Sequence, residues 1–213
     1  MYLYKTMARN IGFIPEEKVQ QALEVFCEKG YSATTLEDLV QAMQINKSSL
    51  YNSFKDKHSL FKECLRAYGK ITEQDYRTAA HKKNGLSPLE MIDRIIDKIT
   101  YRIIEDSNSC LCISASFELA SRNNEVRTII KKTNENTIKL IQMLLKEAQK
   151  HKEIAEDKNC HHMAHLIFST LGGLWYNYKV YQDGVLIKQI ADELKMLLKN
   201  WFFLCISELI GSK

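Results

Sequence analysis

Apolar side chains recur along this chain at spacings of three and four residues, which is the period of an amphipathic helix. The pattern is clearest between residues 35 and 61. A first stripe joins Leu36 to Met43, a break follows at 44–46, and a second short helix is predicted over residues 47–54 with Asn46 as its N-cap. A polar helix braced by an apolar one across such a turn is typical of a helix-turn-helix, which presents side chains to the major groove of DNA.

The same period predicts helices on both sides of this pair. The preceding helix begins at Pro15, where proline is tolerated, and Gly30 ends it. Asp56 caps a helix that runs to about residue 81, and Ser87-Pro88-Leu89-Glu90 is a capping box that opens the next one. Four further helices are predicted near residues 113–121, 125–151, 158–181 and 186–209. No strand pattern stands out, so we expect an all-α fold of about nine helices.

Composition supports this fold class and indicates where in the cell the protein is found. The chain has 213 residues, of which 45% are apolar, and its 8 glycines and 2 prolines favour long helices. No apolar run approaches the roughly 18 residues of a membrane-spanning helix, and the first residues lack the apolar core of a signal peptide. We therefore expect a cytoplasmic protein. Its six cysteines are interpreted as mostly reduced core thiols, because most fall in apolar helical registers.

A set of spaced residues around the predicted helix-turn-helix resembles a known family. Leu50-Tyr51-x-x-Phe54, Lys57 and Leu60-Phe61, preceded by Gly30-Tyr31 and Thr34-Thr35, resemble the DNA-binding head of the TetR family of bacterial transcriptional regulators over about residues 14–65. Two residues depart from the family pattern: Gln44 replaces a turn glycine, and Ser53 replaces a frequent Tyr or His. The resemblance implies a head at residues 14–58, a ligand-binding and dimerisation domain at 59–213, and a flexible arm at 1–13.

The predicted contacts with operator DNA lie in and beside the second helix of this motif. Asn52 can pair with adenine, Lys47 can donate to guanine, and serine hydroxyls serve either base. Tyrosine, threonine and lysine side chains nearby suit phosphates, and the resemblance implies a backbone contact for Tyr51 and for Lys57. The expected set is Thr35, Lys47, Ser48, Ser49, Tyr51, Asn52, Lys55 and Lys57. Charge alone would not indicate DNA, since residues 1–64 hold eight basic and eight acidic side chains.

The last two predicted helices are more apolar than one neighbour needs to cover, which predicts a homodimer interface. The expected interface residues are Leu166, Leu171, Leu174, Leu194, Leu198, Trp201 and Phe202. The resemblance implies a pocket for a small-molecule effector in the middle of the chain, where aromatic and apolar residues suit a greasy or planar compound. The candidate lining residues are Met91, Ile95, Tyr101, Phe117, Ile141, Leu145, Phe168, Trp175 and Tyr178.

We therefore expect a homodimeric, DNA-binding transcriptional regulator of the TetR type. It would be a repressor that a small molecule releases from a palindromic operator, without a cofactor or metal and without a membrane partner. No catalytic motif indicates an enzyme. Two alternatives remain open. The first is a response to oxidation or metal through Cys110 and Cys112, beside a predicted helix start, or through His161 and His165, one helical turn apart. The second is a helical protein-interaction module that does not bind DNA.

Overall fold

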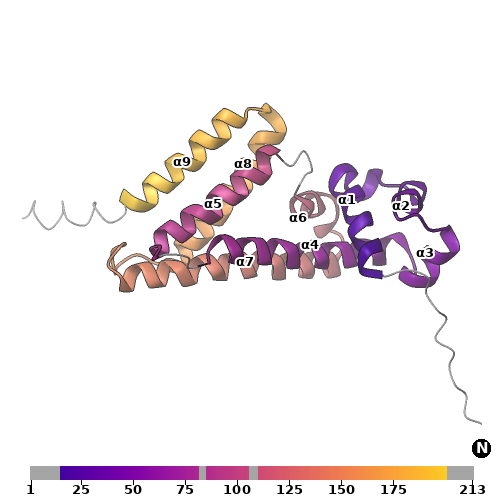
Figure 1. The fold of residues 1–213 in the computed structure, drawn as a ribbon, viewed down its shortest axis with the longest axis horizontal. Helices are drawn as coiled ribbons and strands as arrows, with labels where there is room; N and C mark the ends of the chain where they lie inside the picture. Colours follow the sequence, from indigo (N-terminus) through magenta and orange to yellow (C-terminus); the bar gives the residue numbers. More distant parts are fainter. Residues whose placement is uncertain (1–14, 82–84, 106–109, 201–213) are drawn as a thin grey trace, which may run out of the picture.

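The computed structural model describes residues 15–81, 85–105 and 110–200, and the regular structure within these ranges is entirely helical (Figure 1). The predicted all-α fold with about nine helices is confirmed. The elements in chain order are α1 (Pro15–Ala33), α2 (Leu36–Ala42), α3 (Lys47–Phe54), α4 (Lys57–Ala79), α5 (Pro88–Glu105), α6 (Leu111–Ala115), the π-helix η1 (Ser116–Ala120), α7 (Asn124–Lys150), α8 (Cys160–Tyr181) and α9 (Gly184–Asn200). The predicted arm, residues 1–13, lies outside the described residues.

The molecule is elongated, with α1 to α3 at one end and α5, α8 and α9 towards the other (Figure 1). Helices α4 and α7 run side by side along its length and join the two ends. Two clusters of buried apolar side chains hold it together: one lies in the head, and the second is formed mainly by α5, α7, α8 and α9. The first, called here the head cluster, is centred on Phe26, Leu50 and Phe61 and also takes in Leu111 of α6 and Val126 of α7. The head is therefore packed against the rest of the chain.

The helix starts use the capping signals that the sequence contains. The side chains of Asn46 and Asp56 each accept a hydrogen bond from a backbone N–H three residues on, at 2.8 and 2.6 Å. The capping box before α5 is also present, because the Glu90 carboxylate accepts from the Ser87 N–H at 2.7 Å while the Ser87 hydroxyl accepts from the Glu90 N–H. These bonds fix where α3, α4 and α5 begin.

Three residues of the head have a positive φ: Gly30, Gln44 and Lys55, whose φ is 70°. Gly30 has φ 76° and ψ 177°, and α1 resumes beyond it to Ala33. The regular helix therefore breaks at Gly30, where the sequence placed its end, and a short helical turn follows. Gln44, in the turn between α2 and α3, has φ 51°. A left-handed conformation costs a non-glycine residue roughly 1 kcal/mol, which the burial of Leu39, Met43 and Leu50 on either side of the turn offsets.

Several boundaries differ from the predicted ones. The helix expected near 113–121 begins at Leu111 and changes to a π-helix at Ser116, and the last two helices begin at Cys160 and Gly184. The last helix is described as far as Asn200, and the remainder of the stretch that was predicted to reach residue 209 lies outside the described ranges. Within those ranges, no helix combines the length and the apolar character needed to span a bilayer.

Candidate functional site

Helix α3 is held by its apolar face and shows its polar face to solvent. Leu50 is fully buried and Phe54 nearly so, which fixes the rotation of the helix on α2 and α4. The opposite face carries Ser48, Tyr51 and Asn52, all exposed. Tyr51 is 46% exposed although it is aromatic. An exposed polar face on a short helix, braced by a second helix, is the geometry with which a recognition helix enters the major groove.

Two of the predicted DNA contacts already have partners within the head. The Thr35 hydroxyl accepts from the Asp38 N–H while the Thr35 N–H donates to the Asp38 carboxylate at 2.8 Å, which closes the capping box of α2. The hydroxyl also donates to that carboxylate at 2.8 Å. Lys29 donates to the same carboxylate at 2.7 Å, and with Thr35 it lowers the pKa of Asp38 to about 2. Lys47 forms an exposed ion pair with Glu37. Any anionic group that bound Lys47 would have to compete with this carboxylate.

Lys57, at the first residue of α4, is positioned by aromatic side chains. Its ammonium group lies 4.5 Å from the ring centroid of Tyr31, which is a cation–π contact, and burial lowers its pKa. The Tyr31 ring packs in turn on Phe61, with 4.8 Å between centroids. Among the remaining predicted contacts, Lys55 is exposed just after α3 and Ser49 is half-buried.

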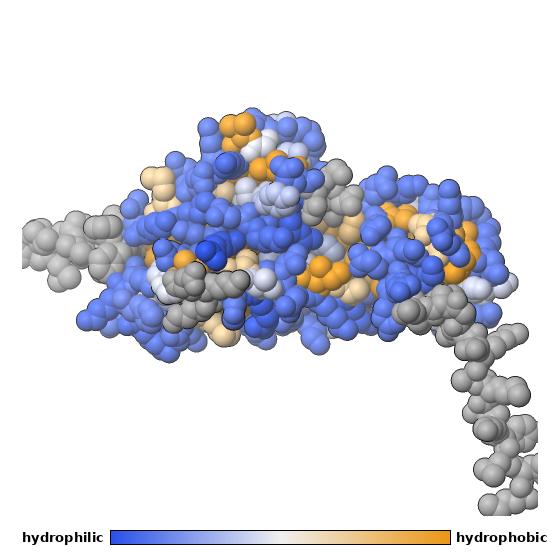
Figure 2. Space-filling model, in the orientation of Figure 1, coloured by the Kyte–Doolittle hydropathy of each residue, from blue (hydrophilic) through white to orange (hydrophobic). Residues whose placement is uncertain are grey.

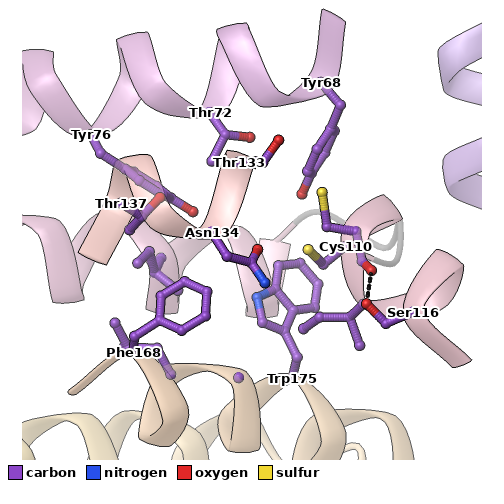
Figure 3. A pocket seen from close by; sticks show the side chains of 15 residues that line it. Tyr68, Thr72, Tyr76, Cys110, Ser116, Thr133, Asn134, Thr137, Phe168 and Trp175 are labelled. Carbon is purple, nitrogen blue, oxygen red and sulfur yellow. Dashed lines mark hydrogen bonds between the residues drawn. The ribbon is translucent and has the colours of Figure 1, made fainter. Parts of the chain in front are cut away.

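A cavity lies behind the head, between α4, α7 and α8 (Figure 3). Its volume is about 100 Å³. Helices α4 and α7 contribute mostly polar groups, α8 contributes mostly apolar ones, and the start of α6 brings two thiols to one side. The lining residues are Tyr68, Thr72, Tyr76, Ile99, Cys110, Cys112, Ile113, Ser116, Thr133, Asn134, Thr137, Phe168, Leu171, Gly172 and Trp175. A concave site with an apolar wall and a few polar groups suits a small molecule.

The lining residues that the structure describes carry no formal charge. Burial raises the pKa of Tyr68, of Tyr76 and of Cys112, so all three groups are protonated at neutral pH. A cation lies just behind the wall: the Arg102 guanidinium donates to the Tyr68 hydroxyl at 3.5 Å and lies 3.8 Å from the Asp75 carboxylate. The positive charge of Arg102 is thus partly balanced by Asp75 and screened from the cavity by the tyrosine.

Only some of the residues that were predicted to line a pocket do so in the structure. Phe168 and Trp175 line the cavity, and Phe117 borders a neighbouring hollow together with Trp175. The other candidates do not line it: Met91, Ile95, Ile141 and Leu145 lie in the second buried cluster, Tyr101 is 59% exposed, and the Tyr178 hydroxyl donates to the Ile104 carbonyl at 3.2 Å. A strongly apolar helical register marks a packed core, and it does not show where that core is incomplete.

The polar wall was missed by the sequence analysis. It consists of Tyr68, Thr72 and Tyr76 on α4 and of Thr133, Asn134 and Thr137 on α7. A signal was present on α4, because residues 68, 72 and 76 follow one another at four-residue spacing on the buried face of that helix. Hydroxyl groups in an inward register need a partner or a cavity, and this requirement could have indicated the site.

The structure separates the predicted dimer residues into two groups. Leu171, Leu174, Leu194 and Leu198 are buried within one protomer, whereas Leu166 is 52% exposed. Trp201 and Phe202 lie outside the described residues. The exposed apolar side chains of α8 and α9 are instead Leu166, Tyr176, Val180, Tyr181, Val185, Met196 and Leu197. Figure 2 shows apolar surface at the turn between these helices, where Val180 and Val185 are found.

A carboxylate connects the cavity side of the molecule to the head. Glu118 of η1 accepts hydrogen bonds from the backbone N–H groups of Tyr31 at 3.1 Å and Ser32 at 2.7 Å, just after the kink in α1. The fit is close, because a Cβ atom added to Gly30 would lie 2.6 Å from a Glu118 carboxylate oxygen. Ser116, two residues before Glu118, lines the cavity. Helices α6 and η1 therefore touch both regions.

The side chains considered for oxidation or metal binding are placed as follows. Cys110 and Cys112 are free thiols, and both line the cavity. The rings of His161 and His165 lie on the exposed face at the start of α8, with 4.5 Å between centroids. In the described part of the chain, no three or more His, Cys, Asp or Glu side chains are grouped so that they could hold a metal ion.

Comparison with known proteins matches the two halves of this architecture. The sequence profile of the bacterial regulatory proteins of the tetR family matches residues 19–64, and that of the tetracyclin repressor-like C-terminal domain matches residues 89–194. The HTH-type transcriptional repressor DhaR of Mycobacterium sp. (strain GP1) is 24% identical over 144 residues, or 68% of this chain and 71% of DhaR. The biofilm operon icaADBC HTH-type negative transcriptional regulator IcaR of Staphylococcus aureus (strain Newman) is 38% identical over 48 residues, 22% of this chain and 26% of IcaR.

Solved structures share the whole fold. The regulatory protein TetR from Rhodobacter sphaeroides superposes with a TM-score of 0.77 at 18% identity, over 85% of this chain and 97% of that one. A cysteine mutant of the TetR family transcriptional regulator CifR, solved with a 26-bp double-strand operator DNA, has a TM-score of 0.73 at 24% identity, over 89% of this chain and 97% of that one. These relatives are transcriptional regulators and not enzymes. With both family profiles matched over most of its length, the chain belongs to the TetR family of DNA-binding transcriptional regulators.

Proposed function

We propose that the chain is a homodimeric repressor that reads a palindromic operator with α3 and leaves it when a small molecule fills the cavity. The observation that carries this proposal is that α6 belongs to both regions: Cys112 lines the cavity and is buried in the head cluster. A ligand that binds one arrangement of α6 more tightly than another shifts the equilibrium between the two arrangements, and the size of the shift is set by the difference in affinity. The head moves with α6. The protein would act in the cytoplasm, where bacterial DNA lies.

In the proposed complex, the exposed face of α3 lies in the major groove. Ser48 and Asn52 face base edges, where asparagine pairs with adenine through two hydrogen bonds. Tyr51 and Lys57 contact phosphates, which position the head without specifying sequence. Lys47 exchanges its exposed partner Glu37 for DNA, at little cost because exposed ion pairs contribute only about 0–1 kcal/mol. Membership in a DNA-binding family removes the support for an interaction module without DNA.

The homodimer would form through the exposed apolar face of α8 and α9. Leu166, Tyr176 and Val180 lie along α8 at helical spacing, and Val185 and Leu197 continue the apolar surface on α9. Two copies of this face in an isologous arrangement make a four-helix interface. The two heads then meet half-sites related by the same two-fold axis, which is why we propose a palindromic operator.

Two paths would connect the cavity to the head. The first is α4, which contributes Tyr68 to the cavity and carries Lys57 at its other end. The second is η1, whose Glu118 holds the backbone of Tyr31, and the Tyr31 ring in turn positions Lys57. Both paths end at the same lysine. Displacement of α6 by a ligand would therefore shift a phosphate contact and the orientation of α3 together.

Selection of bound sequences from a random DNA pool, with purified protein, tests this proposal. We expect a palindrome that Tyr51→Ala binds at least tenfold more weakly, or about 1.4 kcal/mol. Tyr101→Ala, which also removes an exposed tyrosine but on α5, is the matched control and should bind normally. Recovery of a non-palindromic site, or equal binding by the two variants, would count against a dimer that reads DNA through α3.

A response to thiol modification is a second candidate, and one observation favours it. Cys110 is half-buried and lines both the cavity and the hollow beside it, so a reagent in either space can reach its sulfur. An adduct there would fill the space that an effector would occupy. Cys110→Ser should then keep operator binding and lose the release caused by a thiol-reactive compound. Release that persists in Cys110→Ser, with Cys160→Ser as a control thiol, would remove this candidate.

A further inference from the structure

We propose that the cavity takes an uncharged molecule with a single aromatic ring and one hydrogen-bonding substituent. The proposal rests on the cavity assigned above as the effector site, but binding itself does not require DNA. Three properties of the lining carry it: the size of the space, the absence of charged side chains among the described lining residues, and the division into one apolar and one polar wall.

The volume limits the ligand to a small one. A cavity of roughly 150 Å³ in another protein binds benzene, and the cavity here measures about 100 Å³. Cys110 and Trp175 line both this cavity and an adjoining hollow. A single ring with a short substituent can enter with small side-chain movements. A rigid fused-ring system would have to move α7 away from α4 or α8, on both of which it packs.

The apolar wall is shaped for a ring. Phe168 and Trp175 point into the cavity from α8 in Figure 3, one on each side of Gly172 in the sequence. A Cβ atom added to Gly172 would meet no heavy atom within 4 Å, so open space lies directly over this backbone. Aromatic side chains around a bare backbone favour a flat ligand, because ring contacts contribute about 0.5–1.5 kcal/mol beyond buried area.

The polar wall offers an amide group to a ligand. The Asn134 amide points towards the centre of the cavity in Figure 3, and within the described residues its side chain forms no hydrogen bond. Two neighbouring hydroxyls are already engaged, because Thr133 donates to the Ile129 carbonyl and Ser116 donates to the Cys112 carbonyl. An amide can both donate and accept. It therefore fits a hydroxyl, carbonyl or amide substituent on the ring.

The uncharged lining disfavours binding of an ionised form of the same ligand. No Asp, Glu, Lys, Arg or His is among the lining residues that the structure describes, so a buried charge on the ligand would lack a direct partner. The nearest cation, Arg102, is occupied by Tyr68, Thr72 and Asp75. The tyrosine and Cys112 groups stay neutral because burial raises their pKa values.

Three probes of the same size test the inference: benzyl alcohol, benzoate and benzylamine, which at pH 7 are neutral, anionic and cationic. Ligand-observed NMR titration of the full chain without DNA measures weak affinities. We expect benzyl alcohol to bind at least tenfold more tightly than either ion. Equal or tighter binding of benzoate would assign the site to anions through Arg102, and equal or tighter binding of benzylamine would also overturn the inference. So would the lack of saturable binding by all three probes.

Two variants locate the binding. Gly172→Leu fills the open space and should abolish binding, whereas Gly173→Ala, whose Cβ also meets nothing but which does not line the cavity, should leave it unchanged. Asn134→Leu should weaken benzyl alcohol about three- to tenfold, the value of one hydrogen bond, and leave toluene unaffected. Circular dichroism shows that each variant folds. If Gly172→Leu folds and still binds, the ligand lies elsewhere and the inference fails.

Operator release is measured separately, so the two proposals can fail independently. Benzyl alcohol that binds in the cavity but leaves the operator complex intact would contradict the ligand-released repressor and keep the inference about ligand class. An intact operator complex with no probe binding would contradict the inference alone.

Discussion

The contact between Glu118 and α1 yields the sharpest prediction about how the head is attached. The kink at Gly30 interrupts the helical hydrogen bonds, and the turn that follows begins with N–H groups that need acceptors. The Glu118 carboxylate supplies both, at 3.1 Å to Tyr31 and 2.7 Å to Ser32. It acts as an N-cap provided by a residue 86 positions away in the chain.

The magnitude follows from the two bonds. Hydrogen bonds to a charged group contribute about 1.5–3 kcal/mol each when buried, but the bond to Ser32 is exposed and the one to Tyr31 only partly buried. We therefore expect Glu118→Ala to lower the free energy of unfolding by about 2 kcal/mol. For a chain of this size that corresponds to a fall in Tm of about 4–8 °C. Glu118→Gln keeps the size and one acceptor, and should lose about half as much.

Urea denaturation followed by circular dichroism measures this difference. Glu63→Gln is the control, because Glu63 is an exposed carboxylate on α4 whose ion pair with Arg66 should contribute little. A Glu118→Ala variant within about 0.5 kcal/mol of the unaltered chain, the range of ordinary surface substitutions, would refute the reasoning. It would mean that solvent satisfies the two N–H groups as well as the carboxylate does.

A double-mutant cycle separates the carboxylate from the backbone strain. Gly30→Ala introduces a Cβ at φ 76° and places it 2.6 Å from the carboxylate oxygen of Glu118. In the Glu118→Ala background the close contact is gone, and only the backbone strain of a non-glycine residue at φ 76° and ψ 177° remains, about 1–3 kcal/mol. The two substitutions should therefore cost less together than the sum of their separate costs. Simple additivity would show that Gly30 and Glu118 act independently.

Three further comparisons test other parts of the fold. Leu50→Ala, at a fully buried position under α3, should destabilise the protein by about 2–5 kcal/mol, whereas Ser48→Ala on the exposed face should change the unfolding free energy little. Gly69→Ala should be destabilising because its Cβ would lie 2.6 Å from the Thr133 hydroxyl, while Gly172→Ala, with open space, should be neutral or stabilising; opposite results in a thermal melt would contradict the packing of α4 on α7. Asp38 has its pKa lowered to about 2, so its contribution is present above about pH 4 and is lost as pH falls towards 2. The stability gap between the unaltered chain and Asp38→Asn should therefore close over that interval, and a gap that stays constant down to about pH 2 would contradict the assignment.

The head was predictable because its signals are local. Asn46 and Asp56 each cap a helix with a bond to a residue three positions on, and the apolar stripe around Leu50 fixes which face of α3 is free. The break at Gly30 was expected, but the contact of Glu118 with the backbone that follows it was not, because Glu118 lies far along the chain. A pocket was expected in the middle of the chain, but most of its lining was missed for a related reason: a register shows which way Ile95 and Ile141 point, but not whether the neighbouring helix fills the space.

The proposed dimer face shows the same limit of prediction from an apolar pattern. Leu171 and Leu174 belong to the apolar pattern of α8, and the pattern alone cannot separate side chains that meet a neighbouring helix from those that meet a second protomer. In the structure these two side chains are buried within one chain, whereas Leu166 and Val180 on the same helix remain exposed. A helix that is apolar on more than one face needs more than one partner. For α8 the intramolecular partners are α5, α7 and α9, and the exposed remainder is the surface that a second copy of the chain would cover.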